Sequence, residues 1–138
     1  MNSLLLDTHV LIWLLRDADR IAEQVYDRIQ GAANENLLFV SAITPWEIAL
    51  LVAKKKITLE VDVQEWIDAA LSLPGVRLQA LLPEIAVAST RLPWEMHGDP
   101  ADRILVATAR HLGAALVTAD EQLLKHGAQG NFRFLPAS

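Results

Sequence analysis

Short apolar runs and longer segments with one apolar side alternate along the whole chain. A run of three or four apolar residues bounded by polar ones is typical of a strand buried on both faces. Apolar residues that recur every three or four positions are typical of a helix with one buried side. We therefore predict strands over residues 4–6, 37–40, 76–78, 114–117 and 132–135, the third of them at a sheet edge.

Helices are predicted between these strands, over residues 10–15, 19–33, 45–53, 63–72, 83–92, 100–112 and 120–124. Several of their ends carry recognisable start or stop signals. Thr44 precedes a proline and lies three residues before Glu47, which is the pattern of a capping box. Asp99 stands in the same relation to Asp102, and Gly113 is expected to end that helix.

Strands that alternate with helices need crossover connections, which predicts an α/β fold with a mostly parallel sheet flanked by helices. Such connections are right-handed, so the carboxyl ends of all the strands lie at one edge of the sheet. No internal repeat or long linker divides the chain. A single domain is therefore expected over residues 1–138.

The composition excludes several classes of protein. Hydrophobic residues make up 52% of the chain, which suffices for one core, but no apolar run reaches the roughly 18 residues of a membrane span. We find no signal peptide and expect a cytoplasmic protein without a membrane partner. Cysteine is absent, so any metal must bind oxygen or imidazole. The net charge of -5 neither establishes nor excludes a nucleic-acid partner, because carboxylates at a metal site contribute to it.

Four acidic residues are predicted to gather at the carboxyl edge of the sheet. Asp7 ends the first strand, Asp120 follows the fourth, and Glu47 and Asp102 lie in first turns of helices that begin at this edge. Each acid alone can be explained as a helix cap or a partner of the helix dipole. Two carboxylates about 4 Å apart, however, repel by roughly 4 kcal/mol at an effective dielectric constant near 20, which exceeds the contribution of one cap.

A bound cation would relieve this repulsion, and an all-carboxylate site favours Mg²⁺ or Mn²⁺ over zinc. Such ions suit phosphoryl chemistry, because they activate water and neutralise charge on the scissile phosphate. Two other interpretations stay open. A metal-dependent phosphatase is less favoured, because His9 stands where a haloacid-dehalogenase-like enzyme needs a second aspartate. A non-catalytic binding module with the same fold is the second alternative.

Four motifs stand at the predicted sheet edge, in the segments Leu5–His9, Ser41–Ile48, His97–Ala109 and Leu116–Asp120. Together and in this order they resemble the signatures of PIN domains, most closely those of VapC-type toxins from bacterial toxin-antitoxin pairs. The resemblance implies a three-layer α/β/α sandwich and an endoribonuclease that depends on Mg²⁺ or Mn²⁺ and acts on RNA. It also implies a homodimer and inhibition by a small cognate antitoxin that covers the active-site groove.

The resemblance also implies roles for individual residues. The positions of Asp7, Glu47 and Asp102 match the catalytic, metal-binding acids, and Asp120 matches a fourth, more variable one. Two further groups support or extend this set. Thr8 and Thr118 match polar positions near the site, and Asp99 matches an acid that we interpret mainly as a helix cap.

Other residues near the motifs have two interpretations. His97 can contact RNA or relay a proton, although a packing role is favoured, and Arg103 can meet a phosphate or pair with an acid. His126 has no acidic partner in a motif, and we assign it no role. The tryptophans are interpreted mainly as core or interface residues, of which Trp13 and Trp46 lie close enough to site acids to form the pocket wall.

Overall fold

A computed structural model describes residues 2–138 of the chain. In this part, five strands form one sheet in the order β3-β2-β1-β4-β5, and every neighbouring pair is parallel. The strands are β1 (Leu4–Leu6), β2 (Leu38–Ser41), β3 (Val76–Gln79), β4 (Ala115–Thr118) and β5 (Phe134–Pro136). The predicted parallel sheet is confirmed, as is the position of the third strand at an edge.

Every predicted helix is present, although several begin or end at other residues than predicted. They are α1 (Thr8–Arg16), α2 (Glu23–Asn34), α3 (Ile43–Ala53), α4 (Val63–Leu71), α5 (Pro83–Ser89), α6 (Pro100–Leu112) and α7 (Glu121–Ala128). Asp19 does not open α2, because it lies in a separate 3-10 turn, η1 (Ala18–Arg20). Thr44 lies inside α3 instead of capping it. No helix within residues 2–138 is both long and apolar enough to span a membrane.

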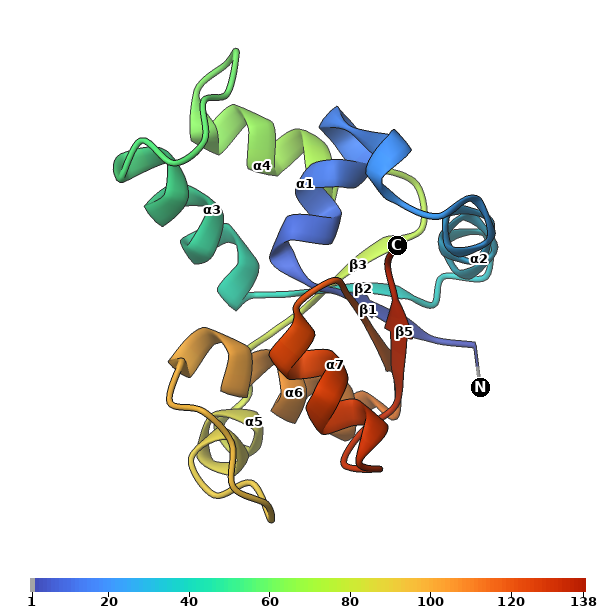
Figure 1. Ribbon diagram of the computed structural model, residues 1–138. Coiled ribbons are helices and arrows are strands. Elements are labelled where there is room, and N and C mark those ends of the chain that lie inside the picture. Colours follow the sequence, from blue (N-terminus) through green and yellow to red (C-terminus); the bar gives the residue numbers. More distant parts are fainter. Residues whose placement is uncertain (1) are drawn as a thin grey trace.

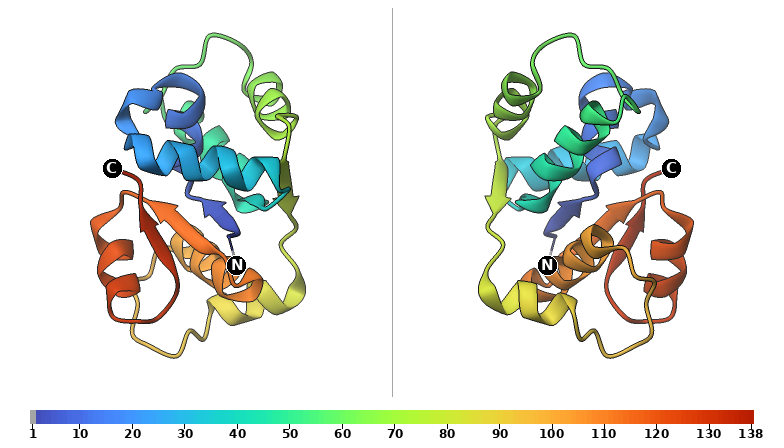
Figure 2. Two further views of the ribbon diagram at one scale, coloured as in Figure 1. Left: turned by 90° about the vertical axis from the view of Figure 1, so that its right-hand side faces the viewer. Right: turned by 90° about the vertical axis from the view of Figure 1, so that its left-hand side faces the viewer.

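Helices cover both faces of the sheet (Figures 1 and 2). Along β1, side chains alternate between the two faces. Leu4 and Leu6 pack in a core with residues of α1, α2, α3 and α4, whereas Leu5 packs in a second core with residues of α6 and α7. The predicted three-layer α/β/α sandwich is therefore confirmed.

The strand order reverses between β1 and β4, which creates a crevice at the carboxyl ends of these two strands. From β1 the chain adds β2 and then β3 on one side, and it returns to place β4 and β5 on the other. Ligands of open parallel sheets bind where the order reverses in this way. Asp7 follows β1 and Thr118 ends β4, so both lie at this point.

Candidate active site

Five acidic side chains line one open pocket of about 340 Å³ at the reversal of strand order. The pocket is lined by Asp7, Glu47, Asp99, Asp102 and Asp120 together with His9, Trp13 and Ala119. These residues come from segments that are far apart in the sequence. The prediction that the acids gather at one edge of the sheet is confirmed.

Asp7 is a helix cap and a pocket residue at once. Its Oδ1 accepts a hydrogen bond of 2.7 Å from the backbone N–H of Thr8 and thereby caps α1. Its Oδ2 accepts a hydrogen bond of 2.6 Å from the hydroxyl of Thr118. The residue as a whole is 8% exposed. The two interpretations of this residue, cap and site acid, are therefore compatible.

Glu47 does not complete a capping box, so that prediction is wrong. The hydroxyl of Ser41 accepts from the backbone N–H of Ile43 at the start of α3, while Thr44 faces the hydroxyl of Thr8 at 3.1 Å. The Thr8 hydroxyl donates to Oε1 of Glu47 at 2.5 Å. Glu47 therefore points from α3 toward the start of α1, that is, toward the pocket.

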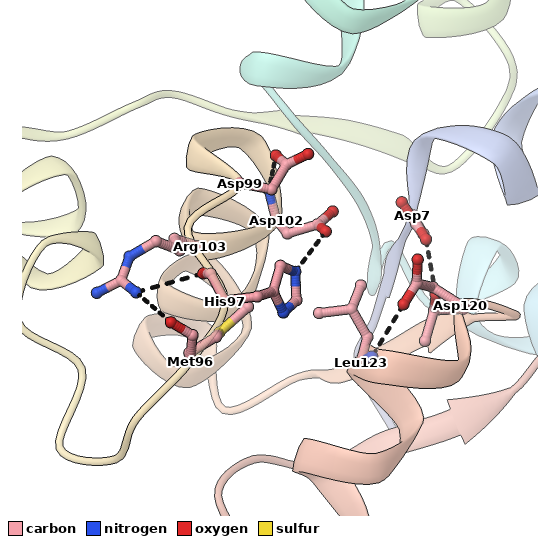
Figure 3. Close-up of polar contacts among 9 residues, drawn as sticks. Asp7, Met96, His97, Asp99, Asp102, Arg103, Asp120 and Leu123 are labelled. Carbon is pink, nitrogen blue, oxygen red and sulfur yellow. Dashed lines mark hydrogen bonds and ion pairs between the residues drawn. The ribbon is translucent and has the colours of Figure 1, made fainter.

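Asp99 and Asp102 lie at the start of α6 (Figure 3). The Oδ1 of Asp99 accepts a hydrogen bond of 3.1 Å from the backbone N–H of Asp102, which confirms Asp99 as the cap of α6. The carboxylate of Asp102 does not fold back onto the helix end. Its Oδ2 lies 2.8 Å from Nε2 of His97, in the loop that precedes the helix.

Thr118 connects two of the acids across β1 and β4. Its hydroxyl donates to Asp7 and accepts from the backbone N–H of Asp120 at 3.1 Å. Asp120 in turn caps α7, because its Oδ1 accepts from the backbone N–H of Leu123 at 3.0 Å. Thr8 and Thr118, predicted as polar positions near the site, thus both hold pocket carboxylates directly.

Burial and mutual repulsion make three of the acids hard to ionise. Burial is the largest cause in each case, and it raises the pKa of Asp7, of Asp102 and, to about 7, of Glu47. The negative charges of Asp7 and Asp102 raise the pKa of Glu47 further, although the hydrogen bond from Thr8 opposes this. Strongly perturbed carboxyl groups that share a pocket are typical of functional sites.

The donor set fits a hard divalent cation by its chemistry, since all the acids offer oxygen ligands. Within residues 2–138, one oxygen each of Glu47, Asp102 and Asp120 accepts no hydrogen bond and can bind a ligand. In the same part of the chain, however, no group of three acidic or histidine side chains is arranged to hold an ion. The role of these residues as metal ligands stays a prediction.

Of the other candidate residues, Arg103 and Trp46 have different surroundings from those expected. The guanidinium of Arg103 donates to the backbone carbonyls of Ser89, Met96 and His97, so it holds the loop before α6 (Figure 3). Its contact with RNA stays a prediction. Trp13 lines the pocket as expected, whereas Trp46 is 55% exposed and is not among the lining residues.

His126 lies near the site, although no role could be assigned to it from the sequence. The ring of His126, on α7, stacks on that of His97 with 5.7 Å between the ring centroids. No motif marks this contact, because the two histidines lie in different segments and neither has a recognisable spacing to the other.

Comparison with known proteins agrees with this fold. The chain is 34% identical over 126 residues to Ribonuclease VapC22 of Mycobacterium tuberculosis, across 91% of this chain and 93% of that protein. Among solved structures, it resembles DNA-bound VapBC from Salmonella typhimurium, with 16% identity, 98% coverage of each chain and a TM-score of 0.71. It also resembles FitAcB from Neisseria gonorrhoeae, with 22% identity, 97% coverage of each chain and a TM-score of 0.67.

A third similar structure is VapBC2 from Rickettsia felis bound to a DNA fragment from their promoter, with 17% identity, 96% coverage of each chain and a TM-score of 0.69. At these identities the solved structures support the fold alone. The PIN domain family matches residues 4–128, which include all five acids of the pocket. The match spans most of the chain and agrees with the resemblance predicted from the motifs. The chain therefore belongs to the PIN domain family.

Proposed function

We propose that this chain is a metal-dependent endoribonuclease and the toxin of a toxin-antitoxin pair. The observation that carries the proposal is the pocket at the reversal of strand order, where five acids meet and burial raises the pKa of three of them. The relative from Mycobacterium tuberculosis is named a ribonuclease, and the similar solved structures include toxin-antitoxin complexes. Both names support this assignment.

We assign Asp7, Glu47 and Asp102, with Asp120 as a fourth acid, as the residues that hold Mg²⁺ or Mn²⁺. When bound, such an ion supplies an activated water and neutralises negative charge on the scissile phosphate. Glu47 has to lose its proton to serve as a ligand, and burial, which raises its pKa to about 7, opposes this loss unless a cation stabilises the carboxylate. Hydrolysis is expected to leave a 5'-phosphate and a 3'-hydroxyl.

Thr8 and Thr118 orient the acids. Each hydroxyl is buried and donates to one carboxylate oxygen, so Thr8 holds Glu47 and Thr118 holds Asp7. Side chains held in this way need little reorganisation when substrate binds. A small cognate antitoxin that covers the pocket, and a homodimer of this chain, complete the proposed assembly.

The test is cleavage of end-labelled RNA by the purified chain with Mg²⁺ or Mn²⁺, before and after addition of a chelator. We expect cleavage that stops on chelation and products with a 5'-phosphate. Release of phosphate from a small ester without cleavage of RNA would favour the phosphatase. Absence of both activities, together with tight binding of a small partner chain, would favour the non-catalytic module.

A further inference from the structure

A packed group of rings includes His97, whose Nε2 lies 2.8 Å from the carboxylate of Asp102. Its members are His97, His126, Trp94 and Phe132, which come from the loop before α6, from α7 and from the segment before β5. We call this group the ring stack. Only His97 in this group contacts a pocket acid through an observed hydrogen bond.

The hydrogen bond between His97 and Asp102 has a defined direction when Asp102 is ionised. A carboxylate can only accept, so Nε2 of His97 carries the hydrogen and donates it to Oδ2 over 2.8 Å. This contact leaves Oδ1 of Asp102 without a hydrogen bond from residues 2–138. His97 therefore determines which carboxylate oxygen of Asp102 remains able to bind a ligand.

Within residues 2–138, no second hydrogen bond holds the His97 ring. Its Nδ1 is buried and has no hydrogen-bond partner among the described residues, and the same is true of Nδ1 of His126 and Nε1 of Trp94. A ring with one hydrogen bond can still rotate about that contact. Packing must therefore determine the orientation of His97, and its stacking contact is His126, with the two ring planes inclined by 25°.

His126 is itself firmly placed. Its ring lies 6.5 Å from that of Trp94, which in turn packs 6.1 Å from Phe132, and its carbonyl accepts from the Asn131 side chain at 3.0 Å. The next residue, Gly127, lies so close to β5 that a Cβ atom there would come within 2.6 Å of the Phe134 ring. The backbone of α7 is therefore held against β5, and His126 with it.

This arrangement gives α7 two contacts with the pocket. Its cap is Asp120, which lines the pocket (Figure 3), and its last turn carries His126, which stacks on the ring of His97. One helix of eight residues thus connects the acid that follows β4 with the acid at the start of α6.

We propose that His126 is a positioning residue for Asp102 and acts through the ring of His97. The inference rests on the proposed function, because it assigns Asp102 as a ligand of the catalytic ion. Groups that hydrogen-bond to metal ligands typically change metal affinity or activity by about 10–100-fold when they are removed. We expect His97→Ala to weaken Mn²⁺ binding within this range and loss of the stack at His126 to weaken it by about tenfold.

The experiment compares His126→Leu, which keeps bulk without a flat ring, with His126→Phe, which keeps the ring. His111→Ala is the control, because His111 is an exposed histidine at the far end of α6. Three measurements are made on each protein: the ¹⁵N signals of the His97 ring without metal, the dissociation constant for Mn²⁺ alone, and kcat and KM for RNA cleavage.

We expect wild type, His126→Phe and His111→Ala to show a single tautomer of the His97 ring. In His126→Leu the two tautomers should average, Mn²⁺ should bind about tenfold more weakly, and kcat should fall more than KM changes. Equal His97 signals and Mn²⁺ affinity in His126→Leu and wild type would overturn the inference. So would tautomer averaging in wild type, which can be observed even if the leucine variant does not fold.

The measurements separate this inference from the proposed function. If wild type binds Mn²⁺ but cleaves no RNA, and His126→Leu binds Mn²⁺ more weakly with altered His97 signals, the ribonuclease assignment fails and the positioning role stands. If wild type cleaves RNA and His126→Leu matches it in all three measurements, the assignment stands and the positioning role fails.

Discussion

The two walls of the acidic pocket are built in different ways. The strand wall consists of Asp7, Thr8, Thr118 and Asp120, which end or follow β1 and β4, with Glu47 bound to Thr8. The helix wall consists of His97, Asp99 and Asp102 at the start of α6. On the strand wall the supporting groups are hydroxyls whose residues are at most 1% exposed. On the helix wall, Asp102 is supported by the ring of His97, which lies in the loop before α6.

This difference shows which kind of interaction determines the position of each acidic side chain. The strand wall follows from the sheet, since Leu6 pairs with Val117 and thereby brings Asp7 beside Thr118. The helix wall depends on side-chain packing between α6, α7 and the loop, because the ring stack and not the sheet places His97. We therefore expect substitutions on the strand wall to act directly on the buried acids and on the hydroxyls that hold them, and those on the helix wall to change mainly the position of Asp102.

The largest effect is expected from Asp7→Asn, on the strand wall. Cleavage of RNA should fall by at least about a hundredfold, because the amide keeps the shape of the side chain and loses its charge. Stability at pH 8 should not fall, since burial raises the pKa of Asp7 and ionisation is unfavourable there. Cleavage assays and denaturant unfolding measure the two effects. Asp19→Asn, on the exposed turn η1, is the matched control, and equal activity of the two variants would contradict the assignment.

Thr118→Val should have the next largest effect. It removes a hydroxyl that donates to Asp7 and accepts from Asp120, so a buried carboxylate loses a partner, at a cost of about 1–3 kcal/mol in unfolding free energy. Cleavage should fall by about 10–100-fold. The control is Thr108→Val, because Thr108 is equally buried but bonds only the carbonyl of Ile104 within α6. If both variants lose the same activity, the hydroxyl of Thr118 has no special role.

Glu47→Gln should raise stability above neutral pH and leave it unchanged in acid. Below the ordinary pKa of 4.5, Glu47 is protonated in both states and contributes no difference. Between pH 4.5 and about pH 7 only the folded chain keeps the proton on Glu47, so the stability of the wild type falls as the pH rises. Above about pH 7 the full cost of ionising the buried Glu47 remains.

Allowing for solvent screening, the glutamine variant should gain roughly 1–2 kcal/mol at pH 8 relative to pH 4. Denaturant unfolding of both proteins across this range, without divalent ions, measures the difference. A constant difference between pH 4 and pH 8 would show that the pKa of Glu47 is not raised by its surroundings.

The smallest effect is expected from Asp99→Ser, on the helix wall. Serine keeps a side-chain oxygen at the cap of α6, and Asp99 is exposed, so stability should change by no more than about 0.5 kcal/mol. Cleavage should change by less than about threefold. Steady-state kinetics with RNA test this expectation. A loss as large as that of Asp7→Asn would mean that Asp99 belongs with the catalytic acids.

Local features of the chain were enough to predict the elements and most of the site. The apolar run over residues 4–6 is followed at once by Asp7, which marks the end of a strand. The apolar run over residues 114–117 ends in the same way, shortly before Asp120. Because crossovers between parallel strands place all carboxyl ends at one edge, these acids had to approach one another. The same reasoning applied to Glu47 and Asp102, whose helices begin at that edge. The pocket confirms the convergence of all four.

The partners of these side chains could not be predicted locally. Thr44 has the spacing of a cap, yet its hydroxyl meets Thr8, which lies 36 positions away, and the hydroxyl of Ser41 accepts from the first backbone N–H of α3 instead. The spacing of a capping box relates only residues that are close in the sequence. It therefore gives no information about a competing hydrogen-bond partner from another helix.

The chain by itself thus determined the order of its strands and helices and the edge at which its acids collect, because periodicity and strand ends are local properties. Only the tertiary structure decided that Glu47 turns to Thr8 and that His126 packs behind His97. These contacts join segments that meet only after the sheet has formed and its two helical layers have packed. Their geometry depends on how neighbouring side chains fill space, for which the sequence carries no spacing signal.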